Sequence, residues 1–323
     1  MKNERDNNEF KQFGLLDWPH LITIVESAQQ QEWLIDQFIY RKGIVFVCGE
    51  WGQGKSPFVL QMLLCLAAGI RFLNHPTTGR PAKVLYADFE NPSFVVKETI
   101  ERLTTYLKLK EVPPTFFVWS PNYSPHGECG GHGNYSHQLE AILRKCGPFE
   151  VIVIDPLRSF NNKAEADNES AMAMIAVLRR WATQTGVVPM IINHPKKGTT
   201  NGQGRSYSLE DDPSDWMERA SGAGALVSNT DVRIGFDRTG QNDELVLRVF
   251  LKGQGWQPPQ YLSRERDEEG NGCGYRSTIA LDRLSSDKQE ALTRLPRHFR
   301  TAELKQVRQN QAAGFSEDRK SVV

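Results

Sequence analysis

The sequence predicts an α/β protein with a mostly parallel central sheet, helices on both faces and antiparallel strands toward the C-terminus. From residue 44 onward, short β-branched or aliphatic runs alternate with longer helical segments, which is the pattern of βαβ units. The run Val151–Ile154 is apolar at every position, as expected of a strand that is buried on both faces. A glycine-rich turn joins the first of these strands to the first helix. Together these features favour a parallel sheet over an all-β or all-α fold.

Seven strands and four helices are expected along the chain. The strands are expected at residues 44–48, 83–87, 115–119, 151–154, 188–193, 232–236 and 245–251. The helices are expected at residues 56–68, 94–107, 137–146 and 169–185. The last two strands are interpreted as hairpin or edge additions. Residues 120–136 and 195–218 are rich in small and polar residues and are interpreted as loops, the second long enough to suggest function or disorder.

The length and charge distribution indicate one large domain with a short appendage. A chain of 323 residues has room for about two domains, or for one elaborated α/β domain. We expect an N-terminal segment over residues 1–31, an α/β domain over 32–282 and a basic helical tail over 283–323. The tail carries nine Lys or Arg against five Asp or Glu, whereas the whole chain is neutral. The tail is either an incomplete winged-helix unit or only a packing helix.

Composition excludes several classes of protein. The balance of 39 basic and 39 acidic residues gives no global positive field that would attract a polyanion, although a local one remains open. The apolar stretches are too short or too interrupted to cross a bilayer, and the polar N-terminus has no apolar core of a signal peptide, so we expect a cytoplasmic protein without a membrane partner. Five scattered cysteines argue against a disulfide framework. The cysteines and histidines of residues 126–146 lack the paired spacing of a structural zinc site.

The most specific motif is a phosphate-binding loop of the form G-x-x-x-x-G-K-[ST], placed between an apolar strand and an apolar helix. Its glycines let backbone N–H groups surround phosphate oxygens, the lysine neutralises the β and γ phosphates, and the serine hydroxyl binds magnesium. Proline is tolerated in the first helical turn because the N–H it lacks has no partner there. The motif predicts ATP with Mg²⁺ as the ligand, held by Gly49, Glu50, Trp51, Gly52, Gln53, Gly54, Lys55, Ser56 and Pro57.

Acidic residues follow two of the predicted strands. Asp155 ends the apolar run 151–154, at the strand end where ligands of open α/β sheets collect, and is predicted to hold the magnesium ion directly or through water. Glu90 follows the strand 83–87 and is the expected general base that polarises the attacking water. Asp88, in the same turn, is the rival for that role.

A polar pair ends the next strand. Asn193 and His194 follow Ile191 and Ile192, and either side chain is placed to contact the γ phosphate and to sense hydrolysis. A single histidine is more often an ordinary surface or core residue, so the sensor role of His194 rests on its position at the same sheet edge as Asp155.

Taken together, these motifs resemble the RecA-like ATPases of the branch typified by the plasmid RepA replicative helicase, which are AAA family ATPases. The resemblance covers roughly residues 32–256 and rests on the residues 49–56, 88–92, 151–157, 191–194 and 221–226. It implies a RecA-type core, ATP hydrolysis with magnesium, Glu90 as catalytic base, Asp155 as the metal acid, His194 as the sensor and often a hexameric ring.

The resemblance also implies that a basic residue of the neighbouring subunit completes each site. Lys252 matches that position, and Arg233 is the best arginine-finger residue, with Arg219 behind it. Related ring helicases often carry a second basic residue two positions after the lysine, where this chain has Gln254. Ordinary exposed strand charges are the alternative interpretation of Lys252 and Arg233.

In such a core, the loops after the strands 151–154 and 188–193 would face the centre of a ring and contact single-stranded DNA. The basic residues there are Arg158, Lys196, Lys197 and Arg205, and a solvated flexible loop is an equally good interpretation. The sequence therefore predicts a homo-oligomeric ATPase that acts as a DNA helicase or helicase-like replication factor. The alternative is a nucleotide-switched regulatory or adaptor protein that binds a protein partner.

Overall fold

The computed structural model describes residues 18, 22, 32–121, 135–194, 208–220, 224–239 and 244–278, and for residues 166, 219 and 220 it describes the backbone only. The chain divides into a compact unit, Met1–Arg276, and a second unit, Ser277–Val323. The fold below is that of the first unit, whose last strand extends to Thr278. The predicted N-terminal segment is described only at residues 18 and 22, and the predicted tail lies outside the described residues, so both stay predictions.

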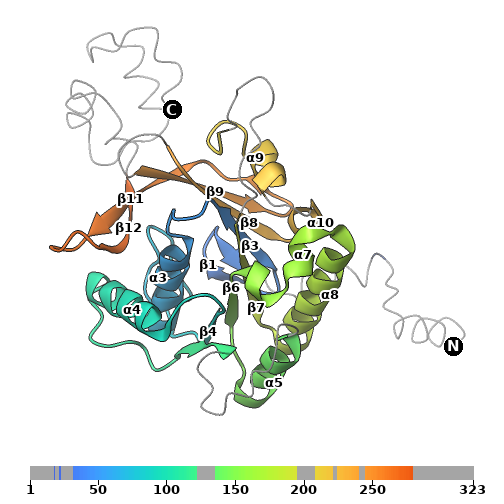
Figure 1. The fold of residues 1–323 in the computed structure, drawn as a ribbon, viewed down its shortest axis with the longest axis horizontal. Coiled ribbons are helices and arrows are strands. Elements are labelled where there is room, and N and C mark those ends of the chain that lie inside the picture. Colours follow the sequence, from blue (N-terminus) through green and yellow to red (C-terminus); the bar gives the residue numbers. More distant parts are fainter. Residues whose placement is uncertain are drawn as a thin grey trace, which may run out of the picture. The chain divides into compact units, whose positions relative to one another are not determined.

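A 10-stranded sheet with the order β12-β11-β9-β8-β3-β7-β6-β4-β5 forms the centre of this unit, and β10 pairs with β9 (Figure 1). Six neighbouring strands are parallel, from β8 to β5 in this order. They are β3 (Val45–Gly49), β4 (Val84–Asp88), β5 (Phe116–Trp119), β6 (Val151–Asp155), β7 (Val188–Asn193) and β8 (Val232–Arg238).

The remaining strands extend one edge of the sheet. Strand β9 (Glu244–Leu251) is antiparallel to β8, and β11 (Gln260–Arg266) and β10 (Gly255–Trp256) are antiparallel to β9. Strand β12 (Gly272–Thr278) pairs with β11 at the edge. A separate two-stranded ribbon consists of β1 (Trp33–Ile35) and β2 (Ile39–Tyr40).

Helices cover both faces of the sheet. Side chains alternate along each buried strand, so each strand contributes apolar side chains to both faces, and both must be covered. Val45 and Val47 point into one core, together with α3 (Lys55–Ala68) and α4 (Ser93–Tyr106). Phe46 and Cys48 point into the other. There they meet α5 (Ser136–Cys146), α6 (Leu157–Phe160), α7 (Asn162–Ala166), α8 (Asn168–Thr185), α9 (Pro213–Ala220) and α10 (Gly224–Ser228). Figure 1 shows α3 and α4 on one side of the sheet and α5, α7 and α8 on the other.

This arrangement confirms the predicted α/β fold class, with a mostly parallel central sheet, helices on both faces and antiparallel strands toward the C-terminus. Every predicted strand and helix is present, with ends that differ by no more than two residues. None of the helices in the described part of the chain is both long and apolar enough to cross a membrane.

Three local predictions are wrong in part. Strand β8 pairs antiparallel with β9 as a hairpin strand would, but it is not an edge strand, because it lies inside the sheet and runs parallel to β3. The predicted loop after β6 contains the short helices α6 and α7, which begin after Pro156 and Asn161, and the Asn161 side chain caps α7 by accepting from the Ala164 amide. The predicted loop 195–218 contains the start of α9, whereas residues 195–207 and most of the other predicted loop, 122–134, lie outside the described residues.

Candidate nucleotide-binding site

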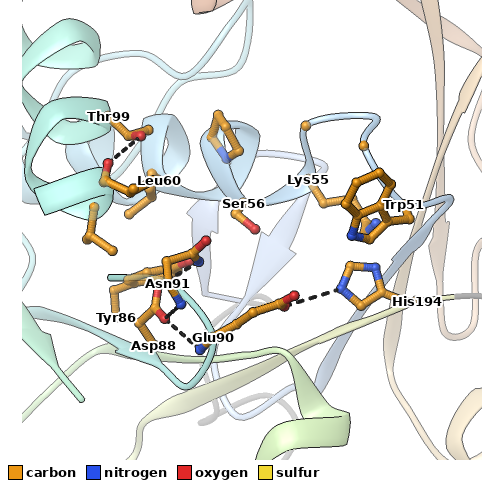
Figure 2. A pocket seen from close by; sticks show the side chains of 15 residues that line it. Trp51, Lys55, Ser56, Leu60, Tyr86, Asp88, Glu90, Asn91, Thr99 and His194 are labelled. Atoms are coloured by element: carbon orange, nitrogen blue, oxygen red, sulfur yellow. Dashed lines mark hydrogen bonds and ion pairs between the residues drawn. The ribbon is translucent and has the colours of Figure 1, made fainter. Parts of the chain in front are cut away.

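The ends of four parallel strands meet at one edge of the sheet, where ligands of open α/β sheets bind. In the strand register, Cys48 lies beside Asn193 and Asp88 beside Asp155, so the motifs that follow these strands converge. They surround a cavity of about 270 Å³ between the phosphate loop, the β4–α4 turn and His194 (Figure 2). The structure therefore brings the phosphate loop, Glu90 and His194 together.

The phosphate loop has the backbone that its glycines allow. Gly52 and Gly54 have φ angles of 77° and 87°, which lie in the left-handed region that glycine adopts without strain. A Cβ atom on Gly54 would also lie 2.0 Å from the Tyr275 hydroxyl, which donates a hydrogen bond to the Gly54 carbonyl over 2.8 Å. Trp51 is 80% exposed on the outside of the loop, whereas Gln53 is buried.

Lys55 begins α3 and folds back over the loop. Its Nζ donates to the carbonyl oxygens of Gly49 at 2.6 Å and Glu50 at 2.7 Å. Burial lowers the pKa of Lys55, and the negative charges of Asp155 and Glu90 work against that shift. The ammonium group is thus a desolvated cation at the floor of the site, where a phosphate oxygen would be a stronger partner than a carbonyl.

Asp155 and Tyr86 are buried next to Lys55, and the half-buried Ser56 lies beside them. Asp155 accepts a hydrogen bond from the Tyr86 hydroxyl at 2.5 Å and another from the Ser56 hydroxyl. Burial raises the pKa of Asp155 to about 6, although both hydrogen bonds and Lys55 favour its ionised form. A hydroxyl and a carboxylate are the hard oxygen ligands that Mg²⁺ prefers, so this pair fits the predicted metal site.

Asp88 and Glu90 have different environments. Asp88 is fully buried, and its Oδ1 accepts from the backbone amides of Glu90 at 2.8 Å and Asn91 at 2.7 Å. Its Oδ2 accepts from the Asn91 side chain at 3.0 Å. Glu90 instead points into the cavity, and its Oε2 lies 3.8 Å from His194 Nε2 (Figure 2). Asp88 shapes the turn, and both carboxylates line the cavity, with Glu90 the more exposed of the two.

His194 is uncharged at neutral pH. Burial lowers its pKa to about 4, and the positive charges of Lys55 and Arg158 add to this shift. Its contact with Glu90 is therefore not an ion pair. A neutral imidazole has one N–H donor and can bond a phosphate oxygen without carrying a charge of its own. Asn193, the other predicted sensor, is buried at the end of β7.

The residues predicted to act across a subunit interface lie at the opposite edge of the sheet. Arg233 pairs in register with Phe46, three residues before the phosphate loop begins at Gly49, and stacks over the Phe250 ring at 4.2 Å. Lys252 is exposed, and its Nζ lies 3.5 Å from Asp231 Oδ1. Within one chain the structure does not bring either residue to the cavity. Arg219 belongs to α9, and its side chain lies outside the described part of the chain.

The predicted nucleic-acid residues are described only in part. Arg158 lies on α6 and is exposed, near enough to His194 to affect its pKa. Lys196, Lys197 and Arg205 lie outside the described residues. Within the described ranges no group of three or more His, Cys, Asp or Glu side chains could hold a metal ion. That search does not include His126, Cys129 and His132, which belong to the cysteines and histidines of residues 126–146 and lie outside the described residues.

Sequence reasoning missed several residues of this region. Tyr86 occupies one position of an apolar strand, and nothing in the sequence separates its hydroxyl from the core pattern. Asn91, Val95 and Thr99 line the far end of the cavity on the turn before α4 and on α4 itself. Tyr275 reaches the loop from β12, a strand that was not predicted.

Residues 11–200 match the family described as AAA domain. A crystal structure of the RadB recombinase is similar with a TM-score of 0.48 and 15% sequence identity, over 74% of this chain and 92% of that chain. No curated protein matches the sequence. Because the family match covers more than half of the 323 residues, this chain belongs to the AAA domain family.

Proposed function

We propose that this chain is a magnesium-dependent ATPase. The observation that carries the proposal is the buried ammonium group of Lys55 on the phosphate loop, beside a cavity that Ser56 and Glu90 also line. A hydroxyl, a carboxylate and a cation at the mouth of a glycine-rich loop are the groups that bind a nucleotide triphosphate with its metal ion. Glu90 faces the same cavity from the other side, where an attacking water would lie.

Each side chain has a separate part in the mechanism. Lys55 exchanges the Gly49 and Glu50 carbonyls for phosphate oxygens, and the backbone amides of the loop hold the remaining charge. Mg²⁺ held by Ser56 and Asp155 would neutralise charge on the β and γ oxygens. Glu90 accepts the proton of the attacking water, and neutral His194 donates a hydrogen bond to the γ phosphate.

Two substitutions test the ATPase proposal. Lys55→Ala should abolish binding of a fluorescent ATP analogue, because it removes the cation at the floor of the site. Glu90→Gln should leave binding within about twofold and lower kcat by about 100-fold or more, the usual size of general-base catalysis. Glu111→Gln, an exposed carboxylate of the loop before β5, is the matched control. Normal turnover by Glu90→Gln would assign the base to another residue.

We further propose that the protein assembles into a homo-oligomeric ring, with a hexamer favoured, in which Lys252 and Arg233 of one subunit complete the site of the next. Their position at the edge away from their own phosphate loop supports contact with a neighbouring site. A cation supplied in this way stabilises charge on the transferring phosphoryl group.

Mixed oligomers test this arrangement. The Lys55→Ala variant keeps Lys252 and Arg233, and the Lys252→Ala variant keeps an intact phosphate loop. A mixed oligomer therefore contains some interfaces with a complete site, so mixing the two inactive variants should restore part of the ATPase activity. Sedimentation with and without ATP measures the oligomer size. A monomer that retains full ATPase activity at all concentrations would overturn the proposal.

We propose single-stranded DNA as the partner and a helicase or helicase-like replication factor as the role. Support comes from the basic residues after β6 and β7, Arg158, Lys196, Lys197 and Arg205. Single-stranded DNA should raise the ATPase rate several-fold, and the gain should fall with salt, because contacts to phosphates release counterions. An unchanged rate without strand displacement would favour the alternative, a nucleotide-switched regulatory or adaptor protein.

A further inference from the structure

We propose that Asp237 is a positioning residue that joins the phosphate loop to helix α9, so that nucleotide binding at the loop changes the stability of the segment 208–220. This proposal rests on the proposed nucleotide site. It explains how nucleotide binding could affect the segment 208–220, which follows the predicted DNA-contacting residues along the chain.

On one side, Asp237 holds the phosphate loop through Gln53. Gln53 Nε2 donates to Asp237 Oδ1 over 2.8 Å, and Gln53 is 4% exposed. Gln53 stands between Gly52 and Gly54, the two loop residues with positive φ. Because the flanking glycines restrict the backbone little, the buried side chain of Gln53 is the anchor of this part of the loop.

On the other side, the same carboxylate holds α9. Trp216 Nε1 donates to Asp237 Oδ2 over 2.9 Å, and Trp216 is 8% exposed. The neighbouring Met217 and Leu209 pack onto β8 where Gly235 leaves space for them, since a Cβ atom there would lie 2.6 Å from the Leu209 side chain. The segment is thus docked on the strand that carries Asp237.

Asp237 lies where it can serve both segments. Strand β8 pairs with β3, and Phe236 is in register with Gly49, the last residue of β3. Asp237 is the next residue of β8, so its side chain stands beside the start of the loop. Its Oδ1 also accepts from the Arg238 amide over 2.8 Å, which fixes the orientation of the carboxylate. The Asp237 carboxylate therefore holds two donors from distant parts of the chain, Gln53 and Trp216.

Nucleotide binding is expected to change the conformation of the phosphate loop. Lys55 is now bonded to the Gly49 and Glu50 carbonyls, and phosphate binding requires it to exchange those partners. The loop carbonyls then lose their cation, and a change in the loop backbone carries Gln53 with it. Because Gln53 and Trp216 share one carboxylate, a shift of the first donor alters the bond of the second. Binding energy at the loop is thereby transmitted to α9.

Hydrogen exchange on the full-length chain tests the proposal, with and without Mg²⁺ and the slowly hydrolysed analogue ATPγS. In the native protein, nucleotide should change exchange in peptides from residues 208–220 by about fivefold or more, because the opening equilibrium of α9 depends on the Asp237 contact. Asp237→Leu keeps roughly the side-chain size but offers no acceptor oxygen to either donor, whereas an asparagine could still pair with a flipped Gln53 amide. It should retain ATPγS binding within about tenfold while the response of residues 208–220 disappears.

Two further variants make the test specific. Asp211→Leu makes the same chemical change at an exposed position of the same segment and should respond like the native protein. Trp216→Phe keeps an aromatic side chain and removes the N–H donor, so it should also lose the response. This second variant tests the proposal even if Asp237→Leu fails to fold. If ATPγS binds and residues 208–220 do not respond, or if both variants respond like the native protein, the proposal is overturned and the nucleotide site stands. If the native chain does not bind ATPγS, both proposals fail.

Discussion

The substitution Gln61→Leu tests how the last strand supports the nucleotide-binding helix. Gln61 lies on α3 and is 2% exposed, and its amide pairs with the backbone of Tyr275 on β12. Nε2 donates to the Tyr275 carbonyl over 2.9 Å, and Oε1 accepts from the Tyr275 N–H over 2.7 Å. Leucine is similar in size and can form neither bond, so the change removes the pairing without opening a large cavity.

The expected loss of stability follows from the partners that remain. The Tyr275 carbonyl still accepts from the Tyr106 hydroxyl at 3.2 Å, but its N–H becomes a buried donor without an acceptor. Two lost hydrogen bonds at about 1 kcal/mol each, with a further penalty for the unpaired N–H, give a loss of about 2–4 kcal/mol. Tyr275→Phe is the matched comparison: the Gly54 carbonyl keeps its bond from the Phe58 amide at 3.1 Å, so the loss should be about 1 kcal/mol.

Urea unfolding, followed by circular dichroism, measures both changes. The unfolding midpoint should fall further for Gln61→Leu than for Tyr275→Phe, with little change in the slope of the free energy of unfolding against urea concentration. A stability of Gln61→Leu within about 0.5 kcal/mol of the native protein would refute the reasoning, as would the reverse order of the two variants.

Three more substitutions test the site and its surroundings. Asp88→Asn keeps Oδ1 as an acceptor for the Glu90 amide and should retain most of the kcat for ATP, whereas a loss as large as that of Glu90→Gln would make Asp88 the base. The pKa of His194 is lowered to about 4, so its contribution to stability is present above pH 6.5 and is lost as the pH falls toward 4. The titration of His194 should therefore cost the native protein about 1–3 kcal/mol of stability between pH 7 and 4.5, and His194→Asn should not show this loss. Urea unfolding at the two pH values measures the difference. Gly235→Ala forces Leu209 to move from a Cβ contact of 2.6 Å and should cost about 1–3 kcal/mol by thermal unfolding; a neutral result would show that Leu209 repacks freely.

The sequence was informative where one local pattern determined the structure. The phosphate loop and its flanking strand and helix were predictable because the chemistry of phosphate binding needs glycines and a lysine at fixed spacing. Strand β6 was predictable because a strand buried on both faces is apolar throughout. These signals depend on neighbours in the chain and not on the tertiary fold.

Features that depend on distant contacts were not predictable. Strand β8 has the composition of an edge strand, with Arg233, Asp237 and Arg238 in seven residues, yet it lies inside the sheet. Its charges are tolerated because the Arg233 side chain stacks on Phe250 and Asp237 binds donors from the loop and α9. Strand β12 contains two glycines and three polar residues, so its sequence lacks an apolar strand pattern.

The choice between Asp88 and Glu90 shows how structure separates roles that spacing cannot. Both carboxylates follow the same strand, and the sequence makes each of them available to a water molecule near the γ phosphate. The oxygens of Asp88 accept from the amides that set the turn, which favours Glu90 for that role, although Asp88 also lines the cavity. The bond from the Glu90 amide to Asp88 Oδ1 also fixes where the Glu90 side chain leaves the backbone, so the two candidates for the base are coupled in the structure.

The match to the AAA domain family ends at residue 200, but the phosphate loop depends on residues beyond it. Asp237 binds Gln53 within the loop, and the Tyr275 hydroxyl binds the Gly54 carbonyl where the loop enters α3. The backbone of Tyr275 also pairs with Gln61 two turns further along that helix. Since a glycine-rich loop cannot hold its own conformation, these contacts from β8 and β12 determine its shape before any phosphate arrives. The late strands are therefore part of the nucleotide site, and changes in them should alter nucleotide affinity without touching a phosphate-binding residue.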